Sequence, residues 1–378
     1  MNDLIRPFRI DIPQRELDEL RDRLARVRWP HPLEGTDPAD RTRGIPAGEL
    51  AELVEHWRSS YDWRAQETAL DSLPQFITEI DGQRIHFAHV RSSREDAVPL
   101  LVLHGYPSTF AEFAGMIADL VEPADGPAFH VVAPSLPGFG FSTPLSSPGW
   151  TMGRSAGAMV ELMSRLGYER YGVHGGDIGA GIAGMVAGRD EARVQGVHIV
   201  TDPMTAAHTA TFIPGMADRL DADDPVDKQI LDRMSAFTND GSGYLAIQQT
   251  RPQTIAYALA DSPVFQLGWI AEKFHDWTDI KIDRDLLLTH ASIYWFNRAG
   301  GGAAHVLYDQ AHSADWGAPA KVPHGFSIFG ADETVRKLVP APEGAFWAEH
   351  GKGQHFPAME VPDELAADLR AFFASLGD

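Results

Sequence analysis

The sequence predicts an α/β fold with a mostly parallel, doubly wound central sheet, and three observations lead to this prediction. Short runs rich in β-branched and apolar residues alternate with helix-like stretches through much of the chain. One of these runs, 99–103, is apolar throughout, which is typical of a strand covered by helices on both faces. The alternation is interrupted at about 204–307 by a helical stretch rich in Trp, Tyr and Phe, which indicates an insertion between strands of the sheet.

The N-terminal part, 1–95, is expected to form an extension and a first hairpin that pack on the core. Pro13 suits the first turn of a helix. Apolar residues then recur three or four positions apart and so share one face of that helix: Leu17, Leu20, Leu24 and Val27. Pro30 disfavours helical backbone at Trp29, so the helix is expected to end near this point.

The rest of the N-terminal part is expected to contain an extended arm, a second helix and a hairpin. The segment 31–47 is rich in Pro, Gly, Asp and Arg and predicts an extended surface arm, and a second helix is expected over about 48–59. From Phe76 the apolar period becomes two, and Asp81-Gly82 separates the runs 76–79 and 84–90. An Asp-Gly pair between two such runs predicts a β-hairpin.

The core is expected in two parts, 96–203 and 308–378, with a helical cap at 204–307 between them. Core strands are predicted at 99–103, 129–133, 195–201 and 325–329, and core helices at 152–166 and 363–376. Inside the cap, helical periodicity is found at 227–237, 244–249 and 285–292, whereas 343–350 in the core shows no regular period. An aromatic helical insertion between strands of a sheet is a usual form of cap over an active site, and a helical subdomain with an aromatic core is the simpler alternative.

Composition and charge exclude several classes of function. The chain of 378 residues has a net charge of −21, which argues against nucleic-acid and anionic-membrane partners. It contains no cysteine, so disulfides, thiolate catalysis and Cys-ligated metals are excluded. No apolar run approaches the ~18 residues of a membrane span, and 1–11 lacks the apolar centre of a signal peptide. A cytoplasmic protein without a metal or cofactor is therefore expected.

The turn around Asp177 carries the clearest chemical signature. The segment 168–173 predicts a strand and 178–187 a helix, with Gly175 and Gly179 two positions on either side of Asp177. A strand, a tight turn and a helix with small residues at these positions form the nucleophile elbow of an α/β-hydrolase. The glycines are required because the turn is strained and the strand and helix backbones pass closely. An ordinary turn with a helix-capping Asp fits the same residues.

An Asp at this position favours displacement at a saturated carbon over acyl transfer. Attack of a carboxylate on an ester would give only an unstable anhydride, whereas attack on an epoxide or a haloalkane leaves an alkyl ester on the enzyme. Water must then hydrolyse that ester, so the site also needs a base and an oxyanion hole. These partners are expected elsewhere in the chain.

Two further segments match these needs. His104-Gly105-Tyr106-Pro107 follows a buried strand, where the loop of a hydrolase sheet supplies a backbone N–H to the oxyanion hole. The expected donors are the N–H groups of Tyr106 and of Ile178, and a plain strand-to-helix turn is the alternative. His355 lies in the glycine-flanked segment 351–356 ahead of the last helix, the place of the base in the order nucleophile, acid, His.

The acid is expected after the strand 325–329. Gly330-Ala331-Asp332-Glu333 offers two carboxylates, of which Asp332 is preferred, with Glu333 and Asp202 in reserve. Its role is to hold the tautomer of His355 and to stabilise the imidazolium. A literal serine-hydrolase pattern surrounds Ser155, but Pro148 and Gly149 upstream rule out the strand that an elbow requires.

Taken together, these motifs resemble those of the microsomal-type epoxide hydrolases, an α/β-hydrolase family with a distinctive N-terminal extension. The resemblance spans nearly the whole chain, from the segment 6–30 through the two core motifs to Gly353-Gln354-His355-Phe356, where the family has Gly-Gly-His-Phe. The family's acid lies in a Phe-Pro-x-(Asp/Glu) segment, which aligns with Phe329-Gly330-Ala331-Asp332 although Gly330 replaces the Pro. The resemblance also implies that two cap tyrosines donate protons to the epoxide oxygen, and Tyr244 and Tyr308 match these two tyrosines.

The resemblance therefore implies an epoxide hydrolase that forms an alkyl ester on Asp177 and hydrolyses it with water activated by His355. The expected partners are a small apolar epoxide and water, and a homodimer is left open. Such relatives include detoxifying enzymes and enzymes of natural-product pathways. The alternatives are a dehalogenase, which usually places a halide-binding Trp where this chain has Ile178, and a non-catalytic ligand-binding homologue.

Overall fold

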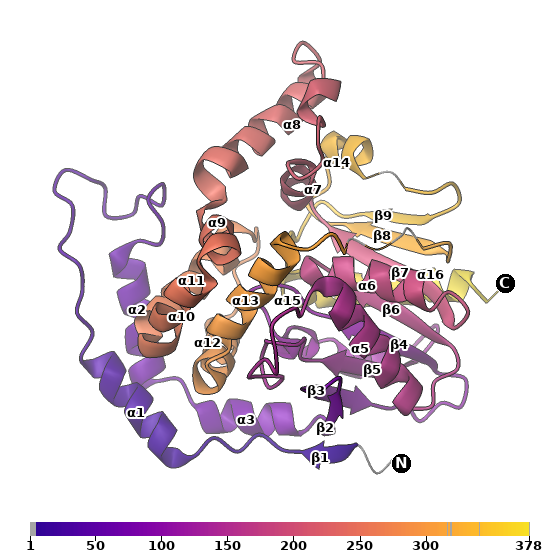
Figure 1. Ribbon diagram of the computed structural model, residues 1–378, viewed down its shortest axis with the longest axis horizontal. Coiled ribbons are helices and arrows are strands. Elements are labelled where there is room, and N and C mark those ends of the chain that lie inside the picture. Colours follow the sequence, from indigo (N-terminus) through magenta and orange to yellow (C-terminus); the bar gives the residue numbers. More distant parts are fainter. Residues whose placement is uncertain (1–4, 316, 318–319, 340, 378) are drawn as a thin grey trace.

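A computed structural model describes residues 5–377 except 316, 318–319 and 340 (Figure 1). Within the described residues one nine-stranded sheet has the order β1-β2-β3-β5-β4-β6-β7-β8-β9. The antiparallel strands are β1 (Arg6–Phe8), β2 (Gln75–Ile80) and β3 (Gln83–Val90). The parallel strands are β4 (Val98–Leu103), β5 (Phe129–Pro134), β6 (Tyr171–Gly175), β7 (Val194–Thr201), β8 (His324–Ile328) and β9 (Phe346–Glu349). The predicted mostly parallel sheet is confirmed.

Helices cover both faces of the parallel strands. Helices α5 (Met152–Arg165) and α6 (Ile178–Arg189) pack together on one face, and α4 (Ile117–Val121) and α16 (Pro362–Ser375) lie on the other. The face under α16 is flattened by glycines in three neighbouring strands, because a Cβ at Gly172, Gly196 or Gly325 would lie within 2.9 Å of Phe372 or Phe373. Aromatic rings of α16 thus occupy the space that side chains on these strands would fill.

The N-terminal part wraps around the lower side of the molecule and reaches the cap (Figure 1). It contains α1 (Gln14–Ala25), α2 (Ala47–Ser59) and α3 (Trp63–Asp71). The indole N–H of Trp57 donates to the Ser292 hydroxyl at 3.0 Å, and the hydroxyls of Tyr61 and Thr289 lie 3.0 Å apart. These buried hydrogen bonds join the extension to a cap helix and hold the cap over the sheet.

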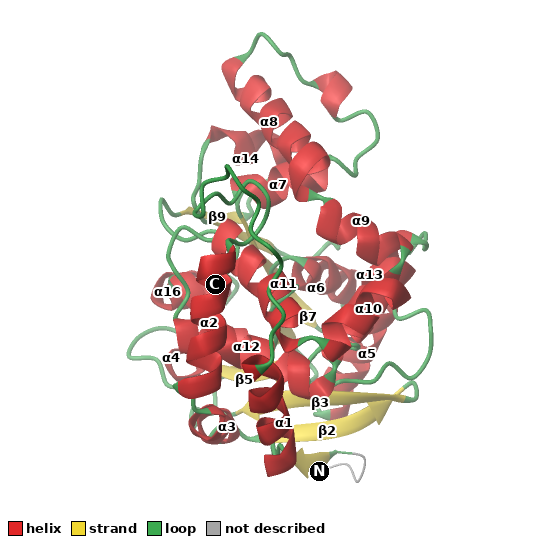
Figure 2. Ribbon diagram, turned by 90° about the vertical axis from the view of Figure 1, so that its left-hand side faces the viewer, coloured by secondary structure: helices red, strands yellow, loops and turns green. Residues whose placement is uncertain are grey.

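The chain between β7 and β8 is helical and rises above the ends of the parallel strands, with α8 at its far end (Figure 2). Its helices are α7 (Pro203–Ala210), α8 (Pro225–Ala236), α9 (Gly243–Thr250), α10 (Pro252–Asp261), α11 (Pro263–Asp276), α12 (Arg284–Asn297) and α13 (Ala299–Ala311), with the short turns η2 (Ala217–Arg219) and η3 (Phe237–Gly241). The remaining short elements of the core are η1 (Phe110–Phe113), α14 (Glu333–Leu338) and α15 (Pro357–Glu360). Among the described residues no helix is long and apolar enough to cross a membrane.

Several local predictions are confirmed and two are corrected. The predicted hairpin forms, with Asp81 and Gly82 both at positive φ (52° and 71°), as its tight turn requires. The first helix ends at Ala25, earlier than expected, although Val27 still packs on the core. The segment 343–350 is not irregular throughout, because Phe346–Glu349 adds β9 to the edge of the sheet. A four-residue edge strand is too short to show a period.

Candidate active site

Asp177 stands at the apex of the turn between β6 and α6. Its φ of 52° and ψ of −127° place a non-glycine residue in a strained backbone region. A Cβ on Gly179 would lie 2.1 Å from the Leu103 carbonyl oxygen, and one on Gly175 would lie 2.3 Å from the oxygen of Gly179. Because these obstacles are backbone atoms that cannot turn aside, the spacing of glycines around Asp177 is a steric requirement of the elbow.

The Asp177 carboxylate is held by backbone donors from two elements. The N–H of Tyr106, in the loop after β4, donates to Oδ1 of Asp177 at 2.8 Å. Gly105 permits this approach, since a Cβ there would lie 2.5 Å from the Cβ of Asp177. The N–H of Ile178, the first residue of α6, also favours the charged carboxylate. Both donors expected for the oxyanion hole therefore lie at the carboxylate.

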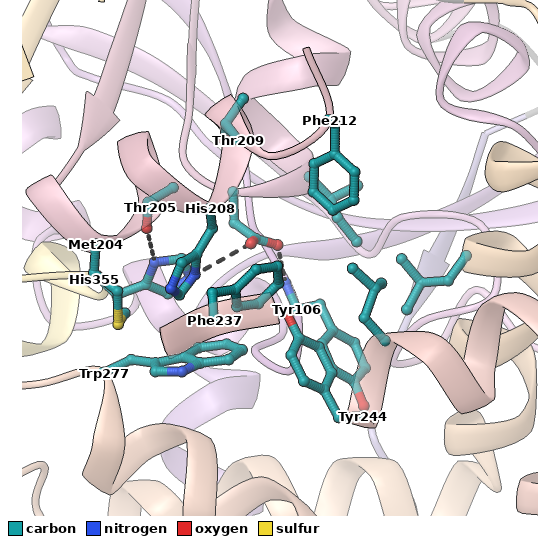
Figure 3. A pocket seen from close by; sticks show the side chains of 14 residues that line it. Tyr106, Met204, Thr205, His208, Thr209, Phe212, Phe237, Tyr244, Trp277 and His355 are labelled. Carbon is teal, nitrogen blue, oxygen red and sulfur yellow. Dashed lines mark hydrogen bonds and ion pairs between the residues drawn. The ribbon is translucent and has the colours of Figure 1, made fainter. Parts of the chain in front are cut away.

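His355 lies between two carboxylates. Its Nε2 is 3.5 Å from Oδ2 of Asp177, and its Nδ1 is 3.4 Å from Oδ2 of Asp202. The hydroxyl of Thr205 stands closer to Nδ1, at 2.8 Å (Figure 3). The same hydroxyl is 2.5 Å from Oδ2 of Asp202. Since a carboxylate only accepts, Thr205 donates to Asp202 and accepts the proton on Nδ1 of His355.

Asp202 is fixed by its own place at the end of β7. It caps α7, where its Oδ1 accepts from the N–H groups of Met204 at 2.8 Å and Thr205 at 2.9 Å. Its side chain is buried, with 2% exposed. A carboxylate with this many donors stays ionised and holds its neighbours in one arrangement.

The three charges support one another. Burial alone would lower the pKa of His355, but the hydrogen bonds and charges of Asp177 and Asp202 outweigh it and raise that pKa to about 10. Burial opposes ionisation of both carboxyls, yet the hydrogen bond and charge of His355 keep the pKa of Asp177 and of Asp202 below the ordinary value. The resting arrangement is thus an imidazolium between two carboxylates.

Asp177 faces two cavities that share part of their walls. The smaller, of about 150 Å³, is lined by Tyr106, Phe237, Tyr244, Trp277, Leu307 and His355 among others. The larger, of about 480 Å³, extends beside α6, α7 and α13 and is mostly apolar, with Asp177 as the charged side chain in its wall. Among the described residues no group of three or more His, Asp and Glu side chains is placed to hold a metal ion.

Known proteins resemble this chain over nearly its whole length. The family model for the epoxide hydrolase N terminus matches residues 5–113, and the model for the alpha/beta hydrolase fold matches 98–233. A putative epoxide hydrolase of Stigmatella aurantiaca (strain DW4/3-1) is 39% identical over 395 residues, covering 98% of this chain and 85% of the relative. The chain belongs to the epoxide hydrolase family.

Other relatives of this epoxide hydrolase agree with that assignment. Epoxide hydrolase 1 of Sus scrofa is 32% identical, with 98% of this chain and 89% of the relative covered. The solved structure of Aspergillus niger epoxide hydrolase has a TM-score of 0.81 and 32% identity, covering 98% of this chain and 96% of that one. The predicted α/β-hydrolase fold, family and enzyme class are confirmed.

Of the three carboxylates predicted as candidates for the triad acid, the structure brings one to His355. Asp332 does not reach His355, because its Oδ1 caps α14 at the Thr334 N–H, 2.9 Å away. Its Oδ2 accepts from the Arg233 guanidinium of α8 at 2.6 Å. Glu333, the first residue of α14, is exposed. The reserve residue Asp202 is the carboxylate that the fold brings to Nδ1 of His355.

The two tyrosines expected in the cap have different surroundings. Tyr244, on α9, lines the smaller cavity beside Asp177, and its ring stacks parallel to that of Tyr106 with the centroids 6.2 Å apart. Tyr308 lines neither cavity; its ring stacks on His312 with the centroids 4.0 Å apart. Leu307, one residue earlier on α13, lies in both cavity walls instead. The structure therefore brings one of the two expected tyrosines to the nucleophile.

Sequence reasoning missed three side chains around the site. Thr205 carries no motif that sets it apart from other threonines that follow a helix cap. His208 lines the smaller cavity and stacks on Phe237 with a centroid distance of 3.9 Å, and burial lowers the pKa of its imidazole to about 4. Lys273 of α11 is buried beside aromatic rings, where a lysine in an amphipathic helix would ordinarily face solvent.

Proposed function

We propose that this enzyme hydrolyses an epoxide to a vicinal diol in two steps, through an alkyl ester on Asp177. One observation carries the proposal. Oδ1 of Asp177 accepts the N–H of Tyr106 at 2.8 Å, while Oδ2 faces Nε2 of His355 at 3.5 Å, in a cavity also lined by Tyr244. A nucleophile, a base and a proton donor thus share one cavity wall.

In the first step a carboxylate oxygen of Asp177 attacks one carbon of the epoxide, and the bond from that carbon to the ring oxygen breaks. Tyr244 donates its hydroxyl proton to the alkoxide that develops on the ring oxygen. Burial and the charge of Asp177 raise the pKa of Tyr244, so the phenol is protonated and ready to donate. The charge of Asp177 disappears when the ester forms, so His355 loses one of its two carboxylate partners. Its pKa then falls, and the proton that it releases restores the hydroxyl group of Tyr244.

In the second step neutral His355 takes a proton from water at Nε2, and the resulting hydroxide attacks the ester carbonyl carbon of Asp177. The N–H groups of Tyr106 and Ile178 stabilise the oxyanion of the tetrahedral intermediate. Its collapse breaks the bond to the alkyl oxygen, which takes the proton of the added hydroxyl group, so that the diol leaves and the carboxylate is restored. Thr205 and Asp202 keep the remaining imidazole proton on Nδ1, so that Nε2 can act as the base.

The cavities support an uncharged, largely apolar substrate. The larger cavity holds about 480 Å³, and its walls carry methionine, isoleucine, valine and phenylalanine with a few uncharged polar groups. A charged substituent would lose its hydration there without gaining a partner. Dehalogenation receives no comparable support, because the side chain of Ile178, next to the nucleophile, has no N–H with which to hold a halide.

The test uses His355→Gln, which is expected to complete the first step and to stall in the second. Incubation with styrene oxide or with 1,2-epoxyoctane should add one substrate mass to the protein, and peptide mapping should place the adduct on Asp177. Asp177→Ala is the control and should gain no mass. The absence of an adduct with every epoxide, although the wild-type enzyme turns them over, would overturn the covalent mechanism.

An isotope experiment on the wild-type enzyme tests the same mechanism independently. When enzyme in excess over epoxide reacts in water enriched in oxygen-18, the first diol should contain no label, because its new oxygen comes from Asp177. The label should instead appear in the Asp177 carboxylate. Direct attack of water on the epoxide would place oxygen-18 in the diol during that first turnover.

The cellular location and the oligomeric state are proposed from the sequence. We propose a cytoplasmic enzyme, and cell fractionation tests this location. A homodimer is tested by light scattering of the purified enzyme.

A further inference from the structure

A third cavity shares a wall with the smaller of the two cavities that Asp177 faces. It holds about 690 Å³ and lies between residues 41–44 of the N-terminal arm and the cap helices α8, α9 and α11. Charged side chains of both signs line it, among them Arg41, Arg43, Asp240 and Asp276. Arg43 and Asp240 are exposed, so this charged groove reaches solvent.

The larger cavity reaches solvent through side chains of the opposite character. Phe212 and Ile213 line it, and they are 54% and 39% exposed. The smaller cavity shares Leu307 with the larger one and Phe237 with the charged groove. The reaction site therefore lies between an apolar space and a charged one.

The substrate and the product of the proposed reaction differ in the same way as these two spaces. An epoxide oxygen only accepts hydrogen bonds, whereas a vicinal diol carries two hydroxyl groups that both donate and accept. A hydroxyl group is costly to bury without a hydrogen-bond partner. Ester hydrolysis leaves the hydroxyl groups beside Asp177, at the wall of the charged groove. The groove offers them polar partners from the start of their exit, and the mostly apolar larger cavity offers fewer.

The partition between the smaller cavity and the charged groove consists of side chains that line both. These are Met204, His208, Phe237, Tyr244 and Trp277 (Figure 3). The Phe237 ring stacks on His208 with the centroids 3.9 Å apart. Phe237 begins the turn η3, in which the N–H of Ser242 donates to the Phe237 carbonyl, five residues earlier, at 2.8 Å. Wide π-type turns of this kind are frequent at functional sites.

We propose that the vicinal diol leaves through the charged groove, past Phe237 and His208, whereas the epoxide enters through the larger cavity. The proposal rests on the proposed function, which supplies the diol, and it gives the groove a ligand class. The Phe237 ring moves aside as the diol passes with its hydroxyl groups leading. Burial keeps the pKa of His208 low and its imidazole neutral, so this ring offers one donor and one acceptor to the passing hydroxyl groups.

The experiment measures ligand exchange without chemistry. In the Asp177→Ala background, stopped-flow tryptophan fluorescence follows the binding and release of 1-phenyl-1,2-ethanediol and of styrene oxide, because Trp277 lines the smaller cavity. Gly243→Phe adds a ring inside the groove, where a Cβ on Gly243 would meet no atom within 4 Å. Gly243→Ala is the matched control, since it changes the backbone preference without filling the groove.

The added ring should slow exchange of the diol in both directions, because it blocks a route and leaves the binding site unchanged. Relative to Gly243→Ala, Gly243→Phe should lower the association and dissociation rate constants of the diol about tenfold each, with Kd within about twofold. Association of styrene oxide should change by less than about twofold. Ile213→Phe, in the exposed wall of the larger cavity, should give the reverse pattern. Phe237→Ala should raise both rate constants of the diol about fivefold.

The proposal is overturned if Gly243→Phe exchanges the diol as fast as Gly243→Ala does, or if it changes the Kd of the diol without slowing its association. It is also overturned if Gly243→Phe and Ile213→Phe give the same pattern, or if Phe237→Ala leaves diol exchange unchanged. None of these results depends on alkylation. A failure of the proposed function would appear instead in the His355→Gln enzyme, as an adduct on a residue other than Asp177 or as none with any epoxide.

Discussion

Replacing Asp202 by Asn is expected to disable the second step of the reaction although the fold is retained. In the native site the Thr205 hydroxyl donates to Oδ2 of Asp202 at 2.5 Å and faces Nδ1 of His355 at 2.8 Å. An Asn at 202 can keep its carbonyl oxygen on the N–H groups that cap α7, which leaves its NH₂ group facing Thr205. The Thr205 hydroxyl must then accept from that NH₂ group, and its own proton turns towards Nδ1 of His355.

This reversal of the Thr205 hydrogen bond determines how far the ester hydrolysis rate should fall. With Nδ1 accepting a hydrogen bond from the Thr205 hydroxyl, neutral His355 carries its proton on Nε2 and cannot take one from water. In a triad whose Asp is changed to Asn, the wrong tautomer lowers turnover by about 10⁴-fold. Because Thr205 stands between the two groups here and can still rotate, we expect a loss of about 10³-fold to 10⁴-fold in the ester hydrolysis rate. Alkylation does not require His355 as a base and should slow by no more than about tenfold.

The matched control is Asp332→Asn, which changes the carboxylate that the sequence favoured. It should weaken the contact of α14 with Arg233 on α8 and leave both chemical steps within about twofold of wild type. Single-turnover kinetics with styrene oxide, with the diol and the alkyl-enzyme quantified, measures both rates. A loss above a hundredfold in Asp332→Asn, together with a loss below tenfold in Asp202→Asn, would falsify the assignment.

Three further changes follow from the same structure. Burial raises the pKa of Glu112 to about 7, so its ionisation destabilises the fold progressively as the pH rises from about 4.5 to 7. The gain in Tm from Glu112→Gln should therefore be larger at pH 8 than at pH 5, and an equal gain at both pH values would contradict this reasoning. Gly179→Ala places a Cβ 2.1 Å from the Leu103 carbonyl oxygen, so soluble expression and cooperative melting should both be lost. A stable and active variant would show that the backbone of the elbow can relax. Ala210→Phe fills part of the larger cavity, so it should raise the KM for 1,2-epoxyoctane by about tenfold and change the KM for propylene oxide little. Equal effects on both substrates would show that the alkyl chain of the longer epoxide binds elsewhere.

The parts of the site that could be predicted are those encoded by local spacing. Asp177 and its oxyanion donors depend on a strand, a turn and close glycines, all of which lie within a few residues of one another. His355 could be placed by chain order and by its glycine-flanked loop. In each case the chemistry and the backbone requirement come from the same short segment.

The parts that could not be predicted depend on contacts between distant segments. Asp202 and Asp332 both follow a strand and both cap a helix, so the sequence does not reveal which one meets His355. The choice is made by Arg233, which comes from the cap and engages Asp332. No local pattern indicates this pairing, because the two residues lie 99 positions apart.

Tyr308 shows how a shift of one residue can displace a functional group. Helix α13 approaches the core through Gly302, where a Cβ would lie 2.5 Å from the Gly138 carbonyl oxygen. This contact sets the rotation of the helix, which turns Leu307 and not Tyr308 towards the cavities. A motif match gives the residue type but not the helical phase, since one position changes the direction of a side chain by about 100°.

The two capping aspartates have a consequence for how this family can diversify. β7 and β8 are adjacent parallel strands, and each is followed within four residues by an Asp that caps the next helix whether or not it serves catalysis. A lineage can therefore carry both carboxylates through every generation while the imidazole turns from one to the other. Exchange of the triad acid between these two strands would then require no change at either Asp, because helix capping keeps both carboxylates in place.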